Sequence, residues 1–200
     1  SLSVSAADAE STKVAALINT ADYSEKVGDK TYAVYDEFIE DMEAVQALIV
    51  EDEGEAVDAT KYIYAYDYTS ASWTNFQNAL DAALEAGVDN SVAYVTVYTT
   101  LAEAVKTAAA NLALDMNNGY TASALRNSLL RSYDSAKAAV NKLNEADYDD
   151  ATKAALTKVK GLFTAESTTK ANSELVYAVA EYKSFVENAG LADIDDELYD

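Results

Sequence analysis

The chain has 200 residues with no proline, cysteine or histidine, and its 35 acidic side chains outnumber 14 basic ones to give a net charge of −21. The lack of cysteine and histidine excludes disulfides, thiolate or imidazole metal ligands, and catalysis by either side chain. The negative charge argues against nucleic acid and anionic membranes, because both are bound through Lys and Arg. No stretch reaches the roughly 20 apolar residues that a bilayer crossing requires, so membrane insertion is not expected.

Helical periodicity runs through most of the chain. Alanine, the strongest helix former, dominates its apolar residues. A short helix is expected from Ala6 to Thr20, and a long amphipathic helix from Lys30 to Glu51, which the acidic stretch around Gly54 ends. Gly87 is expected to close the following helix. Further helices are expected over 70–85, from 89 or 90 to about 114, and over 123–143, 150–162 and 167–188.

These elements predict an all-α fold of two small helical bundles in series. The run Asn117, Asn118 and Gly119 is a turn signal between them. The first lobe is therefore expected over residues 1–117 and the second over residues 118–200.

A short segment repeats across this boundary. The sequence from Tyr68 to Asn75 recurs, with changes, from Tyr120 to Asn127, at an offset of 52 residues (120 − 68). Small helical units are therefore expected to repeat along the chain. In the second copy Leu125 replaces the tryptophan of the first, and the later apolar positions slip by one residue.

The first copy carries a family resemblance. The pairs Tyr68-Thr69 and Ser72-Trp73, with the apolar positions that follow, resemble FIVAR modules of Gram-positive cell-surface proteins over about 66–115. The second lobe resembles them more loosely. The resemblance implies a larger multidomain surface or secreted bacterial protein, a role in adhesion, sugar binding or spacing, and no catalytic residues. The composition is also similar to that of helical starch-adherence modules, of the amylosome type, in gut clostridia.

A run of tyrosines is the most distinctive pattern. Tyrosine occupies every second position ahead of the Thr-Ser stretch, at Tyr62, Tyr64, Tyr66 and Tyr68. If this stretch is extended, the rings lie on one face about 7 Å apart and form a ladder for the flat C–H faces of a glucan. If it is helical, rings two residues apart diverge by about 200° and some belong to the core. The sequence leaves both interpretations open.

Further candidates for sugar contacts follow the run. Tyr94 and Tyr98 stand four residues apart in a predicted helix, so they lie on one side of it, where they line a groove or fill it. Trp73 is assigned to the core, because it shares a helix face with Phe76 and Leu80. The remaining candidates are polar or aromatic side chains near helix starts and turns: Asn75, Asn118 and Tyr120.

Acidic clusters at 51–55 and 147–150 are the only candidates for a metal site. Neither has the spacing of a calcium loop, with its central glycine and terminal glutamate, so both are interpreted as solvated surface. No glycine loop for a nucleotide and no nucleophile motif is present. No metal, cofactor or catalytic residue is therefore expected.

The sequence favours a non-catalytic, extracellular carbohydrate-binding module for a polysaccharide such as starch or another α-glucan. The alternative is a protein-binding or structural spacer module of a bacterial surface adhesin. Exposure of the tyrosines separates the two, because a spacer buries most of its tyrosines between helices. A glycan module leaves several of them on one surface.

Overall fold

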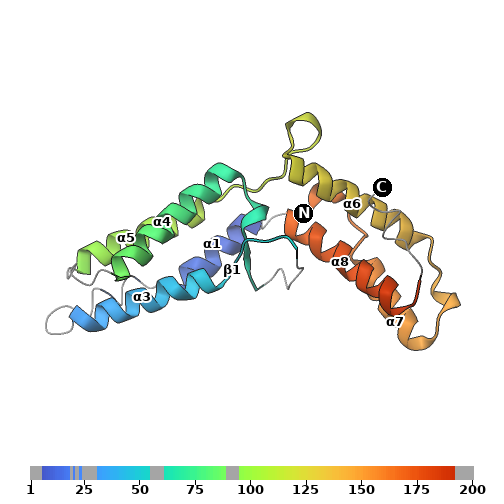
Figure 1. Cartoon of the computed structure of the whole chain (residues 1–200), viewed down its shortest axis with the longest axis horizontal. Helices are drawn as coiled ribbons and strands as arrows, with labels where there is room; N and C mark the ends of the chain where they lie inside the picture. The colour runs from blue at the N-terminus through green and yellow to red at the C-terminus, as the bar shows by residue number, and fades with distance from the viewer. Residues whose placement is uncertain are drawn as a thin grey trace. The chain divides into compact units, whose positions relative to one another are not determined.

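The computed structural model describes residues 6–18, 20, 23, 31–54, 61–88 and 95–191. Regular structure in these residues is mostly α-helical, which confirms the predicted fold class (Figure 1). The chain divides into two compact units. Residues 1–51 and 61–114 form the first, and residues 52–60 and 115–200 form the second.

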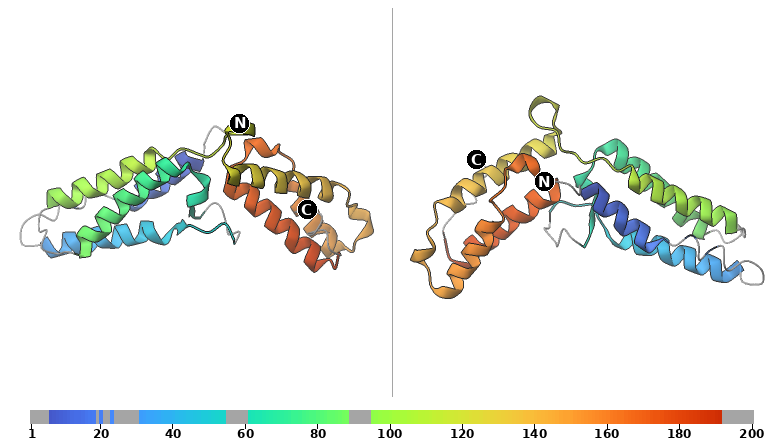
Figure 2. Two further views of the ribbon diagram at one scale, coloured as in Figure 1. Left: turned by 45° about the horizontal axis from the view of Figure 1, so that its top comes forward. Right: turned by 180° about the vertical axis from the view of Figure 1, so that it is seen from behind.

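The first unit is a bundle of α1 (Ala6–Leu17), α3 (Thr31–Ala47), α4 (Ser70–Val88) and α5 (Val95–Ala110). α5 contacts α4, α1 and α3, and α3 also contacts α4. The four helices lie alongside one another in all three views (Figures 1 and 2). The core between them includes Val14, Phe38, Met42, Val45, Phe76, Leu80, Tyr98 and Val105. Gly87 was expected to end α4, but the helix continues through it to Val88.

A pair of two-residue strands follows α3. β1 (Ile49–Val50) pairs in parallel with β2 (Ile63–Tyr64), and Ile49 lies opposite Ile63. The predicted helix through Glu51 is therefore wrong at its end, because α3 stops at Ala47. The β-branched residues Ile49 and Val50 suit a strand. Their backbone N–H and C=O groups find hydrogen-bond partners in β2, in place of the partners that a longer α3 would give them.

The second unit is a bundle of α6 (Ala124–Asn141), α7 (Asp150–Gly161) and α8 (Asn172–Asn188), with α8 in contact with both of the others. The predicted ends of α6 and α7 are correct to within two residues. α8 begins five residues later than expected, since residues 167–169 form a separate 3-10 turn. The core includes Leu130, Tyr133, Val140, Leu156, Phe163, Leu175, Tyr182 and Phe185.

Four of the described helices start in the same way. A three-residue 3-10 turn is followed by two further residues, and the helix begins directly after them. The turns are η1 (Ala65–Asp67) before α4, η2 (Gly119–Thr121) before α6, η3 (Glu145–Asp147) before α7 and η4 (Ser167–Thr169) before α8. When the two segments are aligned on their 3-10 turns, Tyr68, the first residue after η1, corresponds to Ala122, the first residue after η2. The offset between them is 54 residues (122 − 68). Tyr120 is therefore not the structural counterpart of Tyr68.

Candidate functional site

Most of the predicted tyrosine ladder lies inside the first unit. Tyr62 is half-buried, whereas Tyr64, Tyr66 and Tyr68 are 2%, 9% and 5% exposed. The stretch is not one extended strand, because β2 ends at Tyr64 and η1 follows it. Of the two interpretations left open by the sequence, the extended one with four rings on one exposed face is wrong, and the one that places rings in the interior agrees with the structure. The turn breaks the two-residue alternation, and burial of the rings removes a large apolar area from water.

The buried tyrosines make specific aromatic contacts. Tyr64 and Tyr66 pack edge to face with ring centroids 5.4 Å apart. Tyr68 lies stacked on Trp73 at 6.1 Å, and Trp73 packs in turn on Phe76 at 5.3 Å. The assignment of Trp73 to the core holds in part, because this side chain is partly buried and packs against the core cluster. These rings consolidate the start of α4.

The Tyr-Thr and Ser-Trp pairs together form a helix N-terminus. The Thr69 hydroxyl accepts a hydrogen bond from the Ser72 backbone N–H at 3.4 Å, and the Thr69 carbonyl oxygen accepts one from the Trp73 N–H at 3.0 Å. Thr69 is thus the N-cap. Tyr68 before it and Trp73, the fourth helical residue, are the two positions that a hydrophobic staple joins. The motif that carries the family resemblance therefore has a complete structural explanation.

The other two predicted tyrosines of the first unit do not form a surface site. Tyr98 is 1% exposed, and its ring lies 4.8 Å from that of Phe38. It fills the bundle instead of lining a groove. Tyr94 lies outside the described residues.

Asn75 lines a shallow groove between α4 and α5. The groove measures about 530 Å³, and its lining consists of small and neutral polar side chains, among them Ala71, Ala104, Thr107 and Asn111. None of the described residues that line the groove is charged or aromatic. Asn75 can therefore bond a neutral polar group, but the described part of the lining offers no ring on which a sugar could stack.

Tyr120 and Asn118 lie together in a turn of the second unit. Tyr120 is fully exposed, which is unusual for a large apolar ring. Gly119 adopts φ +67°, a value that favours glycine. The Thr121 hydroxyl donates to the Asn118 carbonyl oxygen at 3.1 Å, and the Asn127 amide donates to the Gly119 carbonyl oxygen at 3.3 Å. The turn is thus tied down while its ring is left in solvent.

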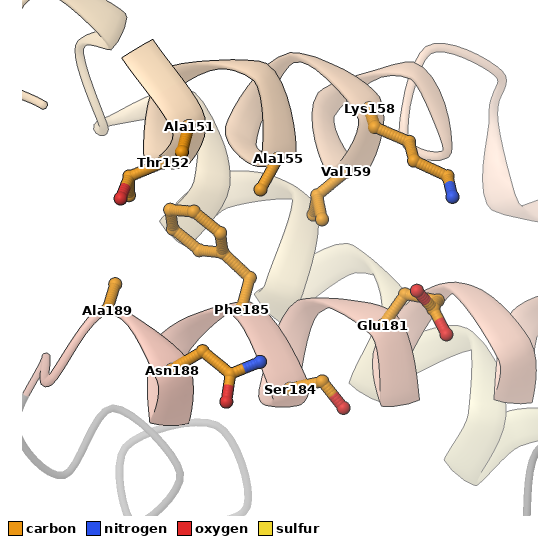
Figure 3. A pocket seen from close by; sticks show the side chains of 10 residues that line it. All are labelled: Ala151, Thr152, Ala155, Lys158, Val159, Glu181, Ser184, Phe185, Asn188 and Ala189. Atoms are coloured by element: carbon orange, nitrogen blue, oxygen red, sulfur yellow. The ribbon is translucent and has the colours of Figure 1, made fainter. Parts of the chain in front are cut away.

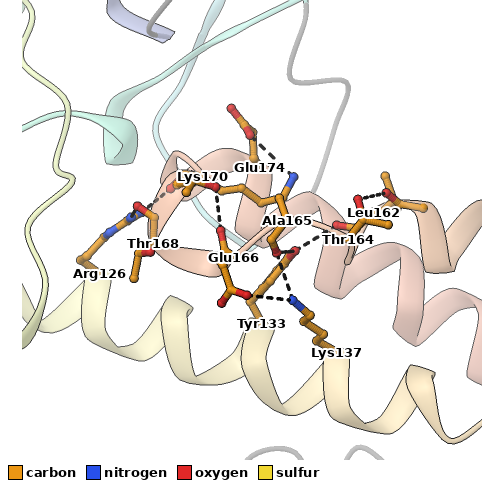
Figure 4. A network of polar contacts seen from close by, with 12 residues as sticks. Arg126, Tyr133, Lys137, Leu162, Thr164, Ala165, Glu166, Thr168, Lys170 and Glu174 are labelled. Atoms are coloured by element: carbon orange, nitrogen blue, oxygen red, sulfur yellow. Dashed lines mark hydrogen bonds and ion pairs between the residues drawn. The ribbon is translucent and has the colours of Figure 1, made fainter. Parts of the chain in front are cut away.

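Sequence reasoning missed a buried arginine in the second unit. Arg126 is fully buried, and its guanidinium donates to the carbonyl oxygens of Lys170 at 2.6 Å and Thr168 at 3.2 Å (Figure 4). It also donates to Asn172 Oδ1 at 3.0 Å. These bonds fix the segment before α8 against the start of α6. The signal was present, because Arg126 shares the helical spacing of Leu130 and Tyr133 on the inner face.

Tyr133 continues this network. Its hydroxyl donates to the carbonyl oxygen of Ala165 at 2.7 Å, and the Lys137 ammonium donates to the same oxygen at 3.4 Å (Figure 4). Burial, followed by the nearby negative charge of Asp134 and of Glu166, raises the pKa of Tyr133. The ring stays neutral and serves as a hydrogen-bond donor, a structural role.

The acidic cluster before α7 has structural roles. Asp149 caps α7 by accepting the Thr152 backbone N–H at 2.8 Å, and the backbone bond followed by the Thr152 hydroxyl lowers the pKa of Asp149. Glu145 lies 3.3 Å from the Lys160 ammonium. Among the residues that the structure describes, no group of three acidic side chains is placed to hold a metal ion. No described helix is long and apolar enough to cross a membrane.

Comparison of the chain with protein-family models, with curated proteins and with solved structures gave no match.

Proposed function

We propose that this chain is a non-catalytic structural spacer module of a larger secreted or surface-attached bacterial protein. The observation that carries the proposal is the burial of Tyr64, Tyr66, Tyr68 and Tyr98, each at most 9% exposed. Buried tyrosines stabilise the fold, whereas rings that bind a polysaccharide have to face solvent. Exposure of the tyrosines separates the two functions considered from the sequence. Because these four rings are buried, it favours a structural spacer over a module that binds a glycan through a tyrosine ladder.

The FIVAR-like motif agrees with this role. Thr69 caps α4 by accepting a hydrogen bond from the Ser72 backbone N–H, and Tyr68 with Trp73 staples the chain ahead of the helix. Such a motif specifies where a helix begins and needs no ligand. Capped helices, two compact units and an acidic, self-repelling surface suit a soluble module that separates other domains. The extracellular bacterial setting rests on the resemblance alone.

Affinity electrophoresis against soluble polysaccharides tests the spacer role. The wild-type chain is expected to migrate with unchanged mobility in gels that contain starch, β-glucan or xylan. Tyr62→Ala tests the half-exposed member of the tyrosine run. Retardation that disappears in Tyr62→Ala while the circular dichroism melt is unchanged would restore the ladder and contradict the spacer.

A second candidate function is α-glucan binding at the turn that holds Tyr120. The specific observation is the full exposure of this ring, beside Asn118, on a turn that hydrogen bonds hold in place. The ring could stack on a pyranose face while the Asn118 amide bonds its hydroxyls. A single shallow platform binds weakly and gains by repetition along a polysaccharide.

Calorimetry with maltooligosaccharides tests this second candidate, with cello-oligosaccharides as the stereochemical control. Binding that Tyr120→Ala abolishes and Tyr62→Ala leaves unchanged would support it. Salt should have little effect, because stacking and neutral hydrogen bonds are barely screened. If neither sugar series gives heat at millimolar concentration, the glycan function is wrong and the spacer stands.

A further inference from the structure

The second unit has a groove between α7 and α8. It measures about 370 Å³, at the lower end of the range for ligand sites, roughly 300 to 1,000 Å³. Small side chains leave this space open between the helices: Ala151, Ala155, Ser184 and Ala189. Phe185 rises from α8 toward α7 and, with Val159, forms an apolar floor (Figure 3).

One end of the groove carries two opposite charges that the fold does not use. Lys158 on α7 and Glu181 on α8 lie at this end (Figure 3). Neither side chain is joined by a hydrogen bond or an ion pair to another described residue. Lys160, two positions along α7, differs in this respect, because the Leu143 carbonyl oxygen and a carboxylate hold it. Lys158 and Glu181 are therefore available to a ligand.

We propose that the groove binds a short peptide segment of another protein. One branched apolar side chain of the segment sits between the methyl groups of Ala151, Ala155 and Ala189, above the buried floor, where its burial drives association. An acidic side chain of the segment pairs with Lys158 on α7 and a basic one with Glu181 on α8, so that the charges fix which side of the segment faces each helix. Thr152 and Asn188, at the opposite end, bond the peptide backbone. This site goes beyond the spacer role and does not depend on it.

The lining selects a peptide over other ligands. A neutral sugar would leave Lys158 and Glu181 without partners, and it would find no open ring face, since Phe185 is only 5% exposed. A nucleic acid strand would be repelled by Glu181 and by the net charge of −21. A peptide with mixed charges around an apolar side chain satisfies the floor and both charges together.

The test is a nuclear magnetic resonance titration of the complete ¹⁵N-labelled chain at low salt. The probe is the capped tetrapeptide Glu-Leu-Leu-Lys. Saturable shifts are expected at the amides of Ala155, Val159, Ser184 and Phe185. The capped peptide Gln-Leu-Leu-Gln should bind at least about three-fold more weakly, the scale of an exposed ion pair. The capped peptide Glu-Ala-Ala-Lys, without the branched side chain, should give no saturable shift.

Variants of α7 give matched controls. Ala155→Phe fills the groove from an exposed helix position and should abolish binding with little change in melting temperature. Lys158→Gln removes one of the two ion pairs, so it should weaken binding of Glu-Leu-Leu-Lys by about half as much in free energy as the loss of both charges in Gln-Leu-Leu-Gln. Lys153→Gln, on the same helix but outside the lining, should change nothing. If Ala155→Phe fails to fold, the comparison of Lys158→Gln with Lys153→Gln tests the site instead. Weaker peptide binding in Lys158→Gln alone supports it, and equal binding in the two variants contradicts it.

Three results would overturn the peptide site. The first is the absence of saturable shifts with Glu-Leu-Leu-Lys. The second is equal binding of all three peptides, which would indicate a nonspecific contact. The third is binding that persists in a folded Ala155→Phe variant, or in Lys158→Gln at full strength. None of these results would bear on the spacer role, which rests on the first unit.

Discussion

The ring of Tyr68 lies parallel to the indole of Trp73, with 8° between their planes. One residue precedes the N-cap of α4 and the other is in its first turns, so the stack holds the incoming chain against the helix. Tyr68, which the sequence offers as a candidate sugar contact, is therefore buried in the packing that begins α4. The same contact means that Trp73 contributes to the stability of the first unit.

Trp73→Ala should destabilise the first unit by about 3 kcal/mol, the low end of the range for removing a buried aromatic, because Trp73 is only partly buried. The loss has two parts, the stack on Tyr68 and the contact with Phe76. Chemical denaturation followed by circular dichroism measures it. Thr74→Ala, next to it and exposed, is the control. An unchanged unfolding midpoint in Trp73→Ala would show that the staple has no energetic role.

Arg126→Ala should cost the second unit on the order of 3 kcal/mol. The substitution removes charge-assisted hydrogen bonds and leaves the carbonyl oxygens of Thr168 and Lys170 without their buried donor. Arg131→Ala, exposed on the same helix, should be nearly neutral. Thermal melts of the two variants make the comparison. Equal melting temperatures would mean that Arg126 is not a structural residue.

Acid should weaken the second unit. A backbone hydrogen bond and then Lys160 lower the pKa of Glu145, and Thr152 lowers the pKa of Asp149. A lowered pKa in the folded state means that the unfolded chain takes up protons first. The stabilisation is therefore complete above about pH 4 and is lost as the pH falls through the folded-state values. Melts between pH 7 and pH 3 should show this decline, and Asp149→Asn should reduce its slope, because the variant lacks the carboxylate that Thr152 stabilises.

Tyr120→Ala should leave stability within about 0.5 kcal/mol of the wild type, because the ring is fully exposed and the turn is held by other groups. Gly119→Ala should be worse tolerated, since its φ of +67° disfavours a Cβ. Thermal melts of both variants test the pair. A large loss of stability in Tyr120→Ala would place this ring in the fold and remove it as a ligand contact.

Periodicity predicted the helices well, because each buries an apolar stripe that repeats at helical spacing, as Leu130 and Tyr133 do. It failed where distant segments decide local structure. The pairing of Ile49 with Ile63 ends α3 early, and a partner 14 residues away in sequence (63 − 49) leaves no local signal. The 3-10 turns were missed for a similar reason, since three residues are too few to show a period.

The candidate site was harder to predict than the fold. Alternating tyrosines from Tyr62 to Tyr68 fit a strand, but a strand with one face in solvent and a strand inside a protein share this pattern. Exposure is a tertiary property, and it separates Tyr120 from Tyr68 although both precede a threonine. The α7–α8 groove has no sequence motif that would predict it. It exists because small side chains on the two helices leave space between them.

Hydroxyl-radical footprinting of the folded chain, read out by mass spectrometry at each tyrosine, tests the central claim most directly. Tyr120 should be oxidised as fast as in the denatured chain, whereas Tyr64, Tyr66, Tyr68 and Tyr98 should be strongly protected, as their exposure of 9% or less requires. Oxidation of Tyr64, Tyr66 and Tyr68 at the rate of Tyr120 in the folded chain would contradict the account, because it would show a solvent-facing ladder that is free to bind a ligand.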